Sequence, residues 1–223
     1  MDQPVSEATV GRLPAYLRSL VELAGDDVAS VPSGRLAELV GVNPATLRRD
    51  LSSLGITGTR GVGYDVKYLL FEISVVLGVN QEWPVAVVGS GNLGRALANY
   101  QGLASRGFPV RVLFDIDETL VGTKIGQLTV QHGDRIPELV REHAITVGVI
   151  ATSIEAAQSV ADQLVGSGVT SILNFTAESI SVPDHVVVRR VDLATELQIL
   201  SFYQQRDTAV SGGGGLPLGG PAD

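Results

Sequence analysis

The sequence predicts an α/β protein with two domains, and three patterns support this fold class. A β-branched strand leads directly into a G-x-G-x-x-G segment within residues 85–97. Apolar strand patterns and amphipathic helix patterns then alternate up to residue 205. Before them, a helix, turn and helix are followed by a glycine-rich stretch. Together these patterns indicate an N-terminal winged-helix domain and a Rossmann-type doubly wound parallel sheet.

The N-terminal segment is predicted to hold three helices before the glycine-rich stretch. Apolar residues at helical spacing predict a first helix over residues 14–23. A second, short helix is expected over residues 34–40, with Ser33 as its cap. Asn43 as N-cap and Pro44 at the first helical position predict a third helix that runs to about residue 54. This order is typical of a helix-turn-helix.

The glycine-rich stretch and the segment after it complete the first domain. Residues 55–64, G-I-T-G-T-R-G-V-G-Y, contain too much glycine for a helix and predict a hairpin tip, the wing. Residues 66–77 return to helical spacing, and residues 78–84 form the expected boundary. We therefore predict a DNA-binding domain over residues 1–80 and a second domain over residues 81–206.

The glycines of residues 85–97 predict a site for a pyrophosphate. Gly89 permits a tight turn, Gly91 lets the main chain approach the phosphates, and Gly94 lets the new helix lie close to the strand. The N-terminus of that helix offers N–H groups to the anion. The next apolar run ends in Asp115, where a carboxylate would accept both ribose hydroxyls of an adenosine. A carboxylate there favours NAD over NADP.

Beyond Asp115, the pattern continues as a parallel sheet with crossover helices. We expect helices over residues 136–143, 153–165 and 192–205, and strands over residues 146–151, 171–175 and 186–190. The last helix, capped by Asp192, carries apolar residues but has no obvious partner within its own domain. Residues 207–223 are linker-like and are expected to be disordered.

Composition limits the function classes. The chain of 223 residues has no cysteine, an acidic N-terminus and no apolar run near the length of a membrane span, so a soluble, cytoplasmic protein is expected. The net charge of −8 argues against bulk attraction to nucleic acid. Residues 35–67 reverse this balance, with five basic residues against three acidic ones. A DNA contact would therefore come from a small local patch.

The arginines of this patch predict where DNA would bind. Arg48 and Arg49 lie in the third helix, where adjacent arginines on an exposed face can reach base edges and phosphates of a major groove. Arg60 lies among glycines in the wing, which suits close approach to a narrow minor groove.

Residues for catalysis or metal binding are few. The three histidines, His132, His143 and His185, are scattered and are expected at the surface, and no metal site is predicted. A dehydrogenase usually needs a general acid or base beside the nicotinamide, and none is evident. A regulator rather than an enzyme is therefore expected. Two alternatives stay open: a small NAD-dependent oxidoreductase with an accessory helical domain, and a ligand-sensing interaction module of the CoA-ligase or channel-regulator type.

With both halves considered, residues 10–206 resemble the Rex family of bacterial redox-sensing transcriptional repressors. The resemblance rests on seven segments in order: L-P-A-Y-L-R (13–18), A-T-L-R-R-D-L (45–51), R-G-V-G-Y (60–64), V-G-S-G-N-L-G (88–94), F-D-I-D (114–117), I-L-N-F-T (172–176) and V-D-L-A-T-E-L-Q (191–198). It implies a homodimer that exchanges its last helix between subunits. It also implies release from DNA by NADH, and an inverted-repeat operator with TTGTGAA-like half-sites.

The resemblance also assigns site residues. NAD would be bound by Gly89, Ser90, Gly91, Asn92, Leu93, Gly94, Asp115, Ile116, Tyr100 and Asp192. The operator would be bound by Arg18, Ser33, Asn43, Ala45, Thr46, Arg48, Arg49, Arg60, Gly61, Gly63 and Tyr64. Tyr100, Arg18 and Asp192 of the partner subunit would form the switch that senses the nicotinamide. The chain departs from the commoner family pattern at Ser53, Leu54 and Thr59, which affects operator details, and at Leu120, Ser153 and Ala177, which affects cofactor affinity.

Overall fold

The computed structural model describes residues 5–211. The chain divides between Glu82 and Trp83 into two compact units, which are described separately below.

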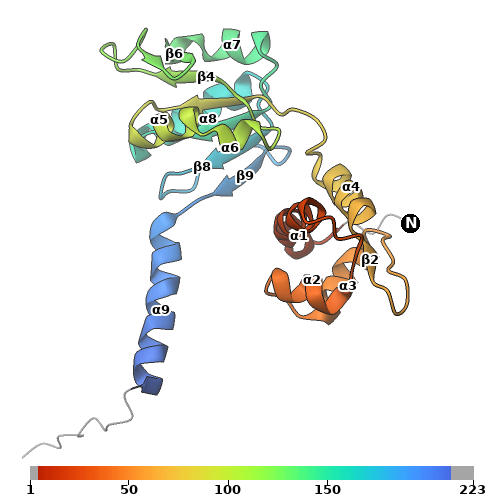
Figure 1. The fold of residues 1–223 in the computed structure, drawn as a ribbon. Coiled ribbons are helices and arrows are strands. Elements are labelled where there is room, and N and C mark those ends of the chain that lie inside the picture. Colours follow the sequence, from red (N-terminus) through yellow and green to blue (C-terminus); the bar gives the residue numbers. More distant parts are fainter. Residues whose placement is uncertain (1–4, 212–223) are drawn as a thin grey trace, which may run out of the picture. The chain divides into compact units, whose positions relative to one another are not determined.

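The N-terminal unit is built from short helices and two very short strands (Figure 1). Its elements are α1 (Glu7–Gly25), β1 (Ser30–Val31), α2 (Ser33–Leu39), α3 (Pro44–Ser53), β2 (Tyr64–Asp65) and α4 (Val66–Leu77). Apolar side chains from all four helices meet in one core, in which Leu13, Leu20, Leu36, Leu47 and Leu69 are fully buried. The amphipathic spacing predicted from the sequence therefore places each helix around a common centre.

Two details of these helices correct the predictions. The first helix begins at Glu7 rather than at residue 14, because Ser6 accepts a hydrogen bond from the Thr9 amide and caps it, while Pro14 lies inside the helix. Ser33 does not cap the second helix; Pro32 holds the N-cap position. The Ser33 hydroxyl instead accepts a hydrogen bond from Arg48.

The third helix and the wing follow the prediction more closely. The Asn43 side chain caps α3 by accepting a bond from the Ala45 amide at 2.8 Å. In the wing, Thr59 pairs with Gly63, and β2 then pairs antiparallel with β1. Gly63 has a φ of 109°, and a Cβ there would clash with the backbone of Val31. The wing therefore returns to β1 only because this position is glycine.

The second unit is a seven-stranded sheet in the order β5-β6-β4-β3-β7-β8-β9. All neighbours are parallel except β5 and β6, which form a hairpin that the sequence analysis did not predict. Without β5, this is the strand order of a Rossmann fold. The strands are β3 (Val85–Val88), β4 (Val110–Asp115), β5 (Lys124–Ile125), β6 (Leu128–His132), β7 (Val147–Ile150), β8 (Ser171–Asn174) and β9 (Val187–Arg190).

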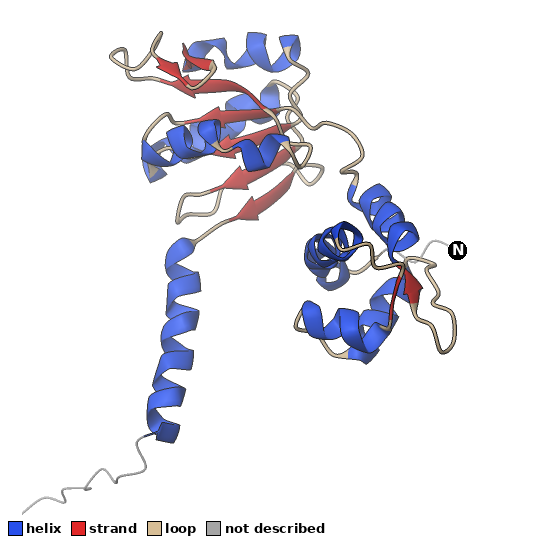
Figure 2. Cartoon of the chain, in the orientation of Figure 1, coloured by secondary structure: helices blue, strands red, loops and turns tan. Residues whose placement is uncertain are grey.

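Helices cover both faces of this sheet, with the strands as a central layer (Figure 2). Ala86 and Val88 of β3 belong to the core on the side of α7 and α8, whereas Val85 and Val87 belong to the opposite core, against which Leu97 of α5 packs. Both sets of alternating residues must therefore be apolar. The helices of this unit are α5 (Asn92–Asn99), α6 (Gln101–Ala104), the short 3-10 helix η1 (Gly133–Arg135), α7 (Ile136–Glu142), α8 (Ile154–Gly166) and α9 (Leu193–Ser211). The predicted fold class is confirmed.

The last helix, α9, differs from the others because residues 193–205 are all exposed. Its apolar side chains Leu193, Leu197 and Leu200 are each more than half exposed. The helix continues to Ser211, past its predicted end at residue 205, so the predicted disordered tail is wrong for residues 207–211. Residues 212–223 of that tail lie outside the described residues.

Among residues 5–211, no helix combines the length and the apolar composition needed to cross a membrane. Nor do the described side chains bring together three histidine, cysteine or carboxylate groups that could ligate a metal ion.

Candidate dinucleotide and nucleic-acid sites

The turn from β3 into α5 requires two of its glycines for steric reasons. Gly89 has a φ of 100°, and a Cβ there would lie 2.5 Å from the carbonyl oxygen of Ala151. At Gly94, on the first turn of α5, a Cβ would clash with the carbonyl oxygen of Gly89. The turn is therefore tight, and the helix lies close against the strand, as the spacing predicts.

Gly91 differs from these two glycines because the space beside it is open. No described atom lies within 4 Å of a Cβ built at this position. Gly91 is the N-cap residue of α5 and has no side chain to satisfy the first N–H groups of the helix. The result is a bare helix N-terminus with room for an anionic group against the backbone.

Asp115, at the end of β4, is held firmly beside this turn. Its Oδ2 accepts hydrogen bonds from the amide and from the hydroxyl of Ser90, both at 2.6 Å. Its Oδ1 accepts the backbone N–H groups of Ile116 and Asp117 at 2.8 Å and 3.1 Å. Ser90 is itself fully buried. The sequence thus placed an acidic group correctly at the strand end, but it gave no sign that Ser90 anchors this group.

These donors also determine the ionisation of Asp115. Partial burial raises the pKa of the carboxyl, but the hydrogen bonds from Ser90, Asp117 and Ile116 favour the anion and leave the pKa below its ordinary value. Asp115 is therefore an anion at neutral pH.

A cleft of about 330 Å³ joins these groups at the carboxyl ends of β3, β4 and β7. It is lined by Gly89, Gly91, Asp115 and Ile116 from the predicted set. Ala151, Thr152 and Ala156, which the sequence analysis did not connect with the cofactor, line it as well, and so does Ser153, where the sequence analysis expected an effect on cofactor affinity. These four residues follow β7, the neighbour of β3 on the side away from β4. Ligands of doubly wound folds bind at this reversal of strand order, so the topology could have indicated them.

The three predicted switch residues lie in separate elements. Tyr100, half exposed, joins α5 to α6. Asp192 caps α9: its carboxylate accepts bonds from the Ala194 and Thr195 amides and from the Thr195 hydroxyl. The Thr195 hydroxyl is the main cause of the lowered pKa of Asp192. Arg18 lies exposed on α1 of the other unit.

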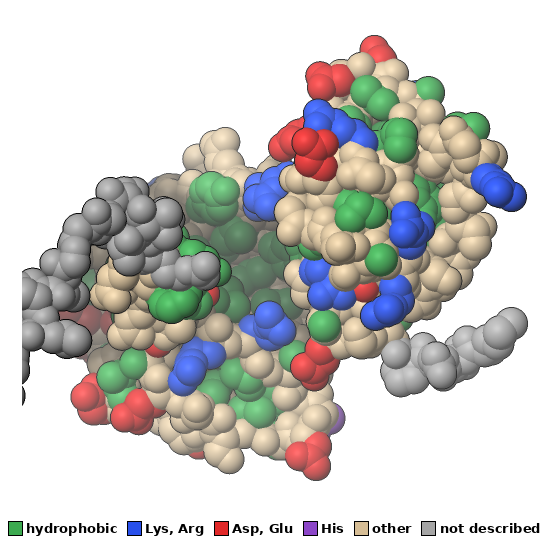
Figure 3. All heavy atoms as spheres, turned by 90° about the horizontal axis from the view of Figure 1, so that it is seen from below, with side chains coloured by type: hydrophobic (Ala, Val, Ile, Leu, Met, Phe, Trp, Pro, Cys, Tyr) green, Lys and Arg blue, Asp and Glu red, His purple; other side chains and the backbone are tan. Residues whose placement is uncertain are grey.

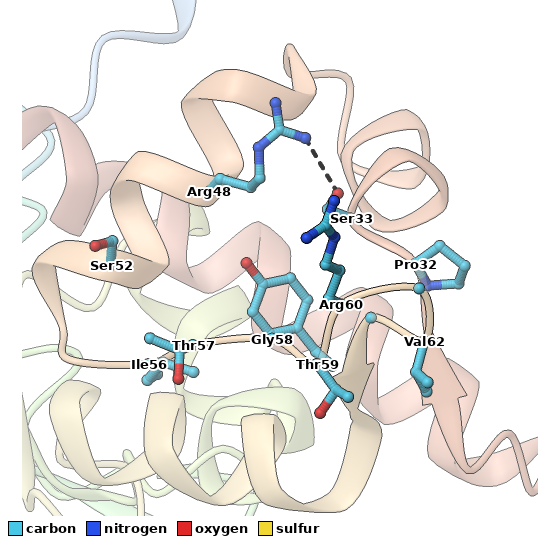
Figure 4. Close-up of a pocket in the computed structure, with 13 residues that line it drawn as sticks. Pro32, Ser33, Arg48, Ser52, Ile56, Thr57, Gly58, Thr59, Arg60 and Val62 are labelled. Carbon is cyan, nitrogen blue, oxygen red and sulfur yellow. Dashed lines mark hydrogen bonds between the residues drawn. The ribbon is translucent and has the colours of Figure 1, made fainter.

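In the N-terminal unit, predicted DNA-binding residues from three elements line one groove of about 560 Å³ (Figure 4). Arg48 comes from α3, Ser33 from α2, and Arg60, Gly61, Gly63 and Tyr64 from the wing and β2. The Arg48 guanidinium donates to the Ser33 hydroxyl at 3.3 Å. The groove also exposes Ser52, Thr57 and Thr59, whose hydroxyls sequence reasoning had not assigned.

The remaining predicted DNA contacts lie on or beside α3. Asn43, Ala45 and Thr46 form its N-terminal end, and Arg49 is exposed on its surface. Several Lys and Arg side chains are visible on the face of this unit shown in Figure 3. The N-terminal end of a recognition helix is the part that reaches base edges.

Comparisons with known proteins match both units. A family model described as "Putative DNA-binding protein N-terminus" matches residues 4–52, and one described as "CoA binding domain" matches residues 80–178. The redox-sensing transcriptional repressor Rex of Streptomyces griseus subsp. griseus is 52% identical over 218 residues, which cover 96% of this chain and 86% of that protein. Rex of Pelotomaculum thermopropionicum is 46% identical, with 89% and 93% covered. The chain belongs to the Rex family.

Solved structures agree with this assignment. RSP, described as a Rex-family repressor, has a TM-score of 0.86 at 32% identity, and the match covers 94% of this chain and 98% of RSP. Crystal structures of RSP exist in complex with β-NAD⁺ and operator DNA, and in complex with β-NADH. Because the relatives are named as transcriptional repressors, the prediction of a regulator is confirmed over the oxidoreductase alternative.

Proposed function

We propose that this protein is a transcriptional repressor that senses the ratio of NADH to NAD⁺. It binds inverted-repeat operators in double-stranded DNA and is released by NADH. The observation that carries the proposal is that one chain holds both a winged helix with Arg48 and Arg60 on a single groove and a glycine turn beside an anchored carboxylate. As a repressor that binds operator DNA, the protein would act in the cytoplasm.

The residues at the glycine turn fit a dinucleotide. The open space at Gly91 and the bare N-terminus of α5 suit a pyrophosphate, which Asn92, Leu93 and Gly94 would contact through their N–H groups. Asp115 would accept the ribose hydroxyls, and its negative charge would repel a 2′-phosphate, which favours NAD(H) over NADP(H). Ile116, three-quarters exposed, would pack on the adenine.

For DNA, we propose that α3 enters the major groove and that the wing lies over the minor groove. Arg48 and Arg49 would contact base edges or phosphates, and Arg60 would enter the narrow groove. Arg48 and Ser33, which are joined by a hydrogen bond of 3.3 Å, would face the DNA together.

We further propose that the repressor is a homodimer in which α9 is exchanged between subunits. Leu193, Leu197 and Leu200 are spaced to form one stripe of the helix, and none is buried within the chain. A second copy of the chain is the partner that would cover this stripe. The two-fold symmetry of such a dimer matches an inverted repeat.

The switch would use Tyr100, Arg18 and Asp192 of the partner subunit. The two forms of the cofactor differ in charge, because the nicotinamide ring is positive in NAD⁺ and neutral in NADH. A carboxylate near the ring distinguishes these states by Coulomb interaction. To change operator occupancy from 99:1 to 1:99, NADH must favour the released form by about 5 kcal/mol.

The test is fluorescence anisotropy of a labelled duplex with an inverted TTGTGAA-type repeat, at fixed salt, titrated separately with NADH and NAD⁺. We expect specific binding that NADH abolishes and NAD⁺ does not. Substitution of Arg48, Arg49 and Arg60 by alanine should abolish binding and leave NADH binding unchanged. Arg141→Ala is the control, because it removes an exposed arginine from the other unit. Failure of the wild type to distinguish the operator from a scrambled duplex would contradict the proposal.

A further inference from the structure

A buried polar cluster connects α1 to α3, and the proposed function makes no use of it. Asp50, on α3, is only 2% exposed. Its carboxylate accepts hydrogen bonds from three side chains of α1. Arg12 donates through Nε at 2.6 Å and through Nη2 at 2.7 Å, the Tyr16 hydroxyl donates at 2.7 Å, and the Thr9 hydroxyl at 3.0 Å.

The three donors lie on one face of α1. Positions 9, 12 and 16 are spaced by three and four residues, so their side chains are neighbours along the helix. The backbone of α1 packs closely along α4 and much less closely against α3. Long side chains that converge on Asp50 therefore supply the directional connection between α1 and the recognition helix.

Packing alone gives no reason for a carboxylate at this position. Leu47 and Leu51 beside Asp50 are fully buried and already provide apolar contact for α3. Replacing a buried ion pair by apolar side chains is often neutral or stabilising, so such a pair is weak support for stability. Directional bonds from three donors instead fix how far α3 is rotated about its own axis and where it lies along α1.

That rotation determines where the arginines of α3 point. Arg48 and Arg49 immediately precede Asp50 and are exposed. Successive helix residues are about 100° apart around the axis, so rotation of α3 would turn Arg48 away from the groove that it shares with the wing and would change the direction of Arg49.

We propose that Asp50 is a positioning residue for DNA recognition, held by Thr9, Arg12 and Tyr16 so that α1 and α3 move as one body. The proposal rests on the proposed function, because it takes α3 as the recognition helix. It deepens that function, because α1 also carries Arg18, the proposed contact to the cofactor switch. A displacement of α1 would be transmitted to the recognition helix through this cluster.

The first variant is Tyr16→Phe, which removes one donor to Asp50 without changing the charge or the shape of the side chain. Tyr68→Phe is the matched control, since Tyr68 lies half exposed on α4 of the same unit. The dissociation constants are measured for the operator and for a scrambled duplex of equal length. The affinity for NADH is measured without DNA.

For Tyr16→Phe we expect the ratio of operator to scrambled affinity to fall by about 5-fold or more, the loss that misaligned base contacts produce. Binding to the scrambled duplex should change less than about twofold, because the phosphate contacts depend on charge. The NADH affinity should equal that of the wild type. A loss of folded protein would lower both duplex affinities equally, so the ratio separates positioning from stability.

Arg12→Lys is the second variant and keeps the positive charge while it loses the two-point contact with Asp50. It should show the same fall in the ratio. A ratio unchanged from the wild type in both variants, or equal losses on both duplexes, would overturn the positioning role. If the wild type itself does not prefer the operator over the scrambled duplex, the proposed function is wrong. If the wild type prefers the operator and both variants do so equally well, only the positioning role of Asp50 is wrong.

Discussion

Replacing Ser90 by alanine tests whether Asp115 is anchored as the structure indicates. The variant removes the hydroxyl that donates to Oδ2 at 2.6 Å and leaves the amide donor in place. Ser90 is fully buried, so the place of its hydroxyl is closed to water, and water reaches the Asp115 carboxylate only from the cleft. A hydrogen bond to a charged group contributes about 1.5–3 kcal/mol to the free energy of unfolding. At roughly 2–4 °C per kcal/mol for a chain of this size, the melting temperature should fall by roughly 3–12 °C at pH 7.

The pH dependence gives a second, independent measurement. The Ser90 bonds help to hold the pKa of Asp115 below its ordinary value. Stabilisation by a lowered pKa is fully present above the pKa of the unfolded chain and is lost as the pH falls through the folded value. The difference between wild type and variant should therefore be largest near neutrality, begin to shrink below about pH 4, the ordinary pKa of an unfolded aspartate, and disappear as the pH falls through the lower pKa of folded Asp115.

Thermal unfolding followed by circular dichroism and by the fluorescence of the single tryptophan, Trp83, provides the assay. Ser105→Ala is the control, because the Ser105 hydroxyl is exposed and donates at 3.3 Å to the Gly102 carbonyl. Its melting temperature should stay within about 1 °C of the wild type. If Ser90→Ala melts as the control does, or if its deficit in melting temperature does not shrink between pH 7 and about pH 3, the carboxylate is not held in this way.

Three further substitutions have defined outcomes. Gly94→Ala should prevent NADH binding and lower the melting temperature, because the new Cβ would clash with the Gly89 carbonyl. Calorimetric titration measures the affinity for NADH, and a normal affinity would contradict the prediction. Gly63→Ala should displace the wing from Val31 and strain the backbone by about 1–2 kcal/mol. Anisotropy should then show weaker operator binding, while the affinity for NADH stays unchanged. Asp192→Ala should remove the cap of α9, keep the fold and blunt the response to NADH; an unchanged NADH dose curve on DNA would refute its place in the switch.

Features determined by neighbouring residues could be predicted from the sequence. Helix α4 has the predicted bounds, because Asp65 caps its start and Gly78 adopts the left-handed conformation at its end. Asn43 and Pro44 likewise specified the start of α3. The glycine turn could also be predicted, because the spacing of its glycines follows from the close packing of α5 against β3.

Features that depend on distant residues could not be predicted in this way. Asp50 follows two arginines in the sequence and suggests a solvated surface, yet it is buried because Arg12 and Tyr16 reach it from another helix. The anchoring of Asp115 by Ser90 depends in the same way on the pairing of β3 with β4. The start of α1 was missed because the prediction relied on the apolar spacing over residues 14–23, whereas Ser6 caps the helix and it begins at Glu7.

The two edges of the sheet bear on how the molecule associates with itself. An exposed strand edge invites another chain to add a strand. One edge here is formed by β5, which is only two residues long and antiparallel to its neighbour. The other edge, β9, ends in the consecutive arginines Arg189 and Arg190. Charge and brevity thus discourage association by growth of the sheet, and the proposed dimer would instead form through the apolar stripe of α9.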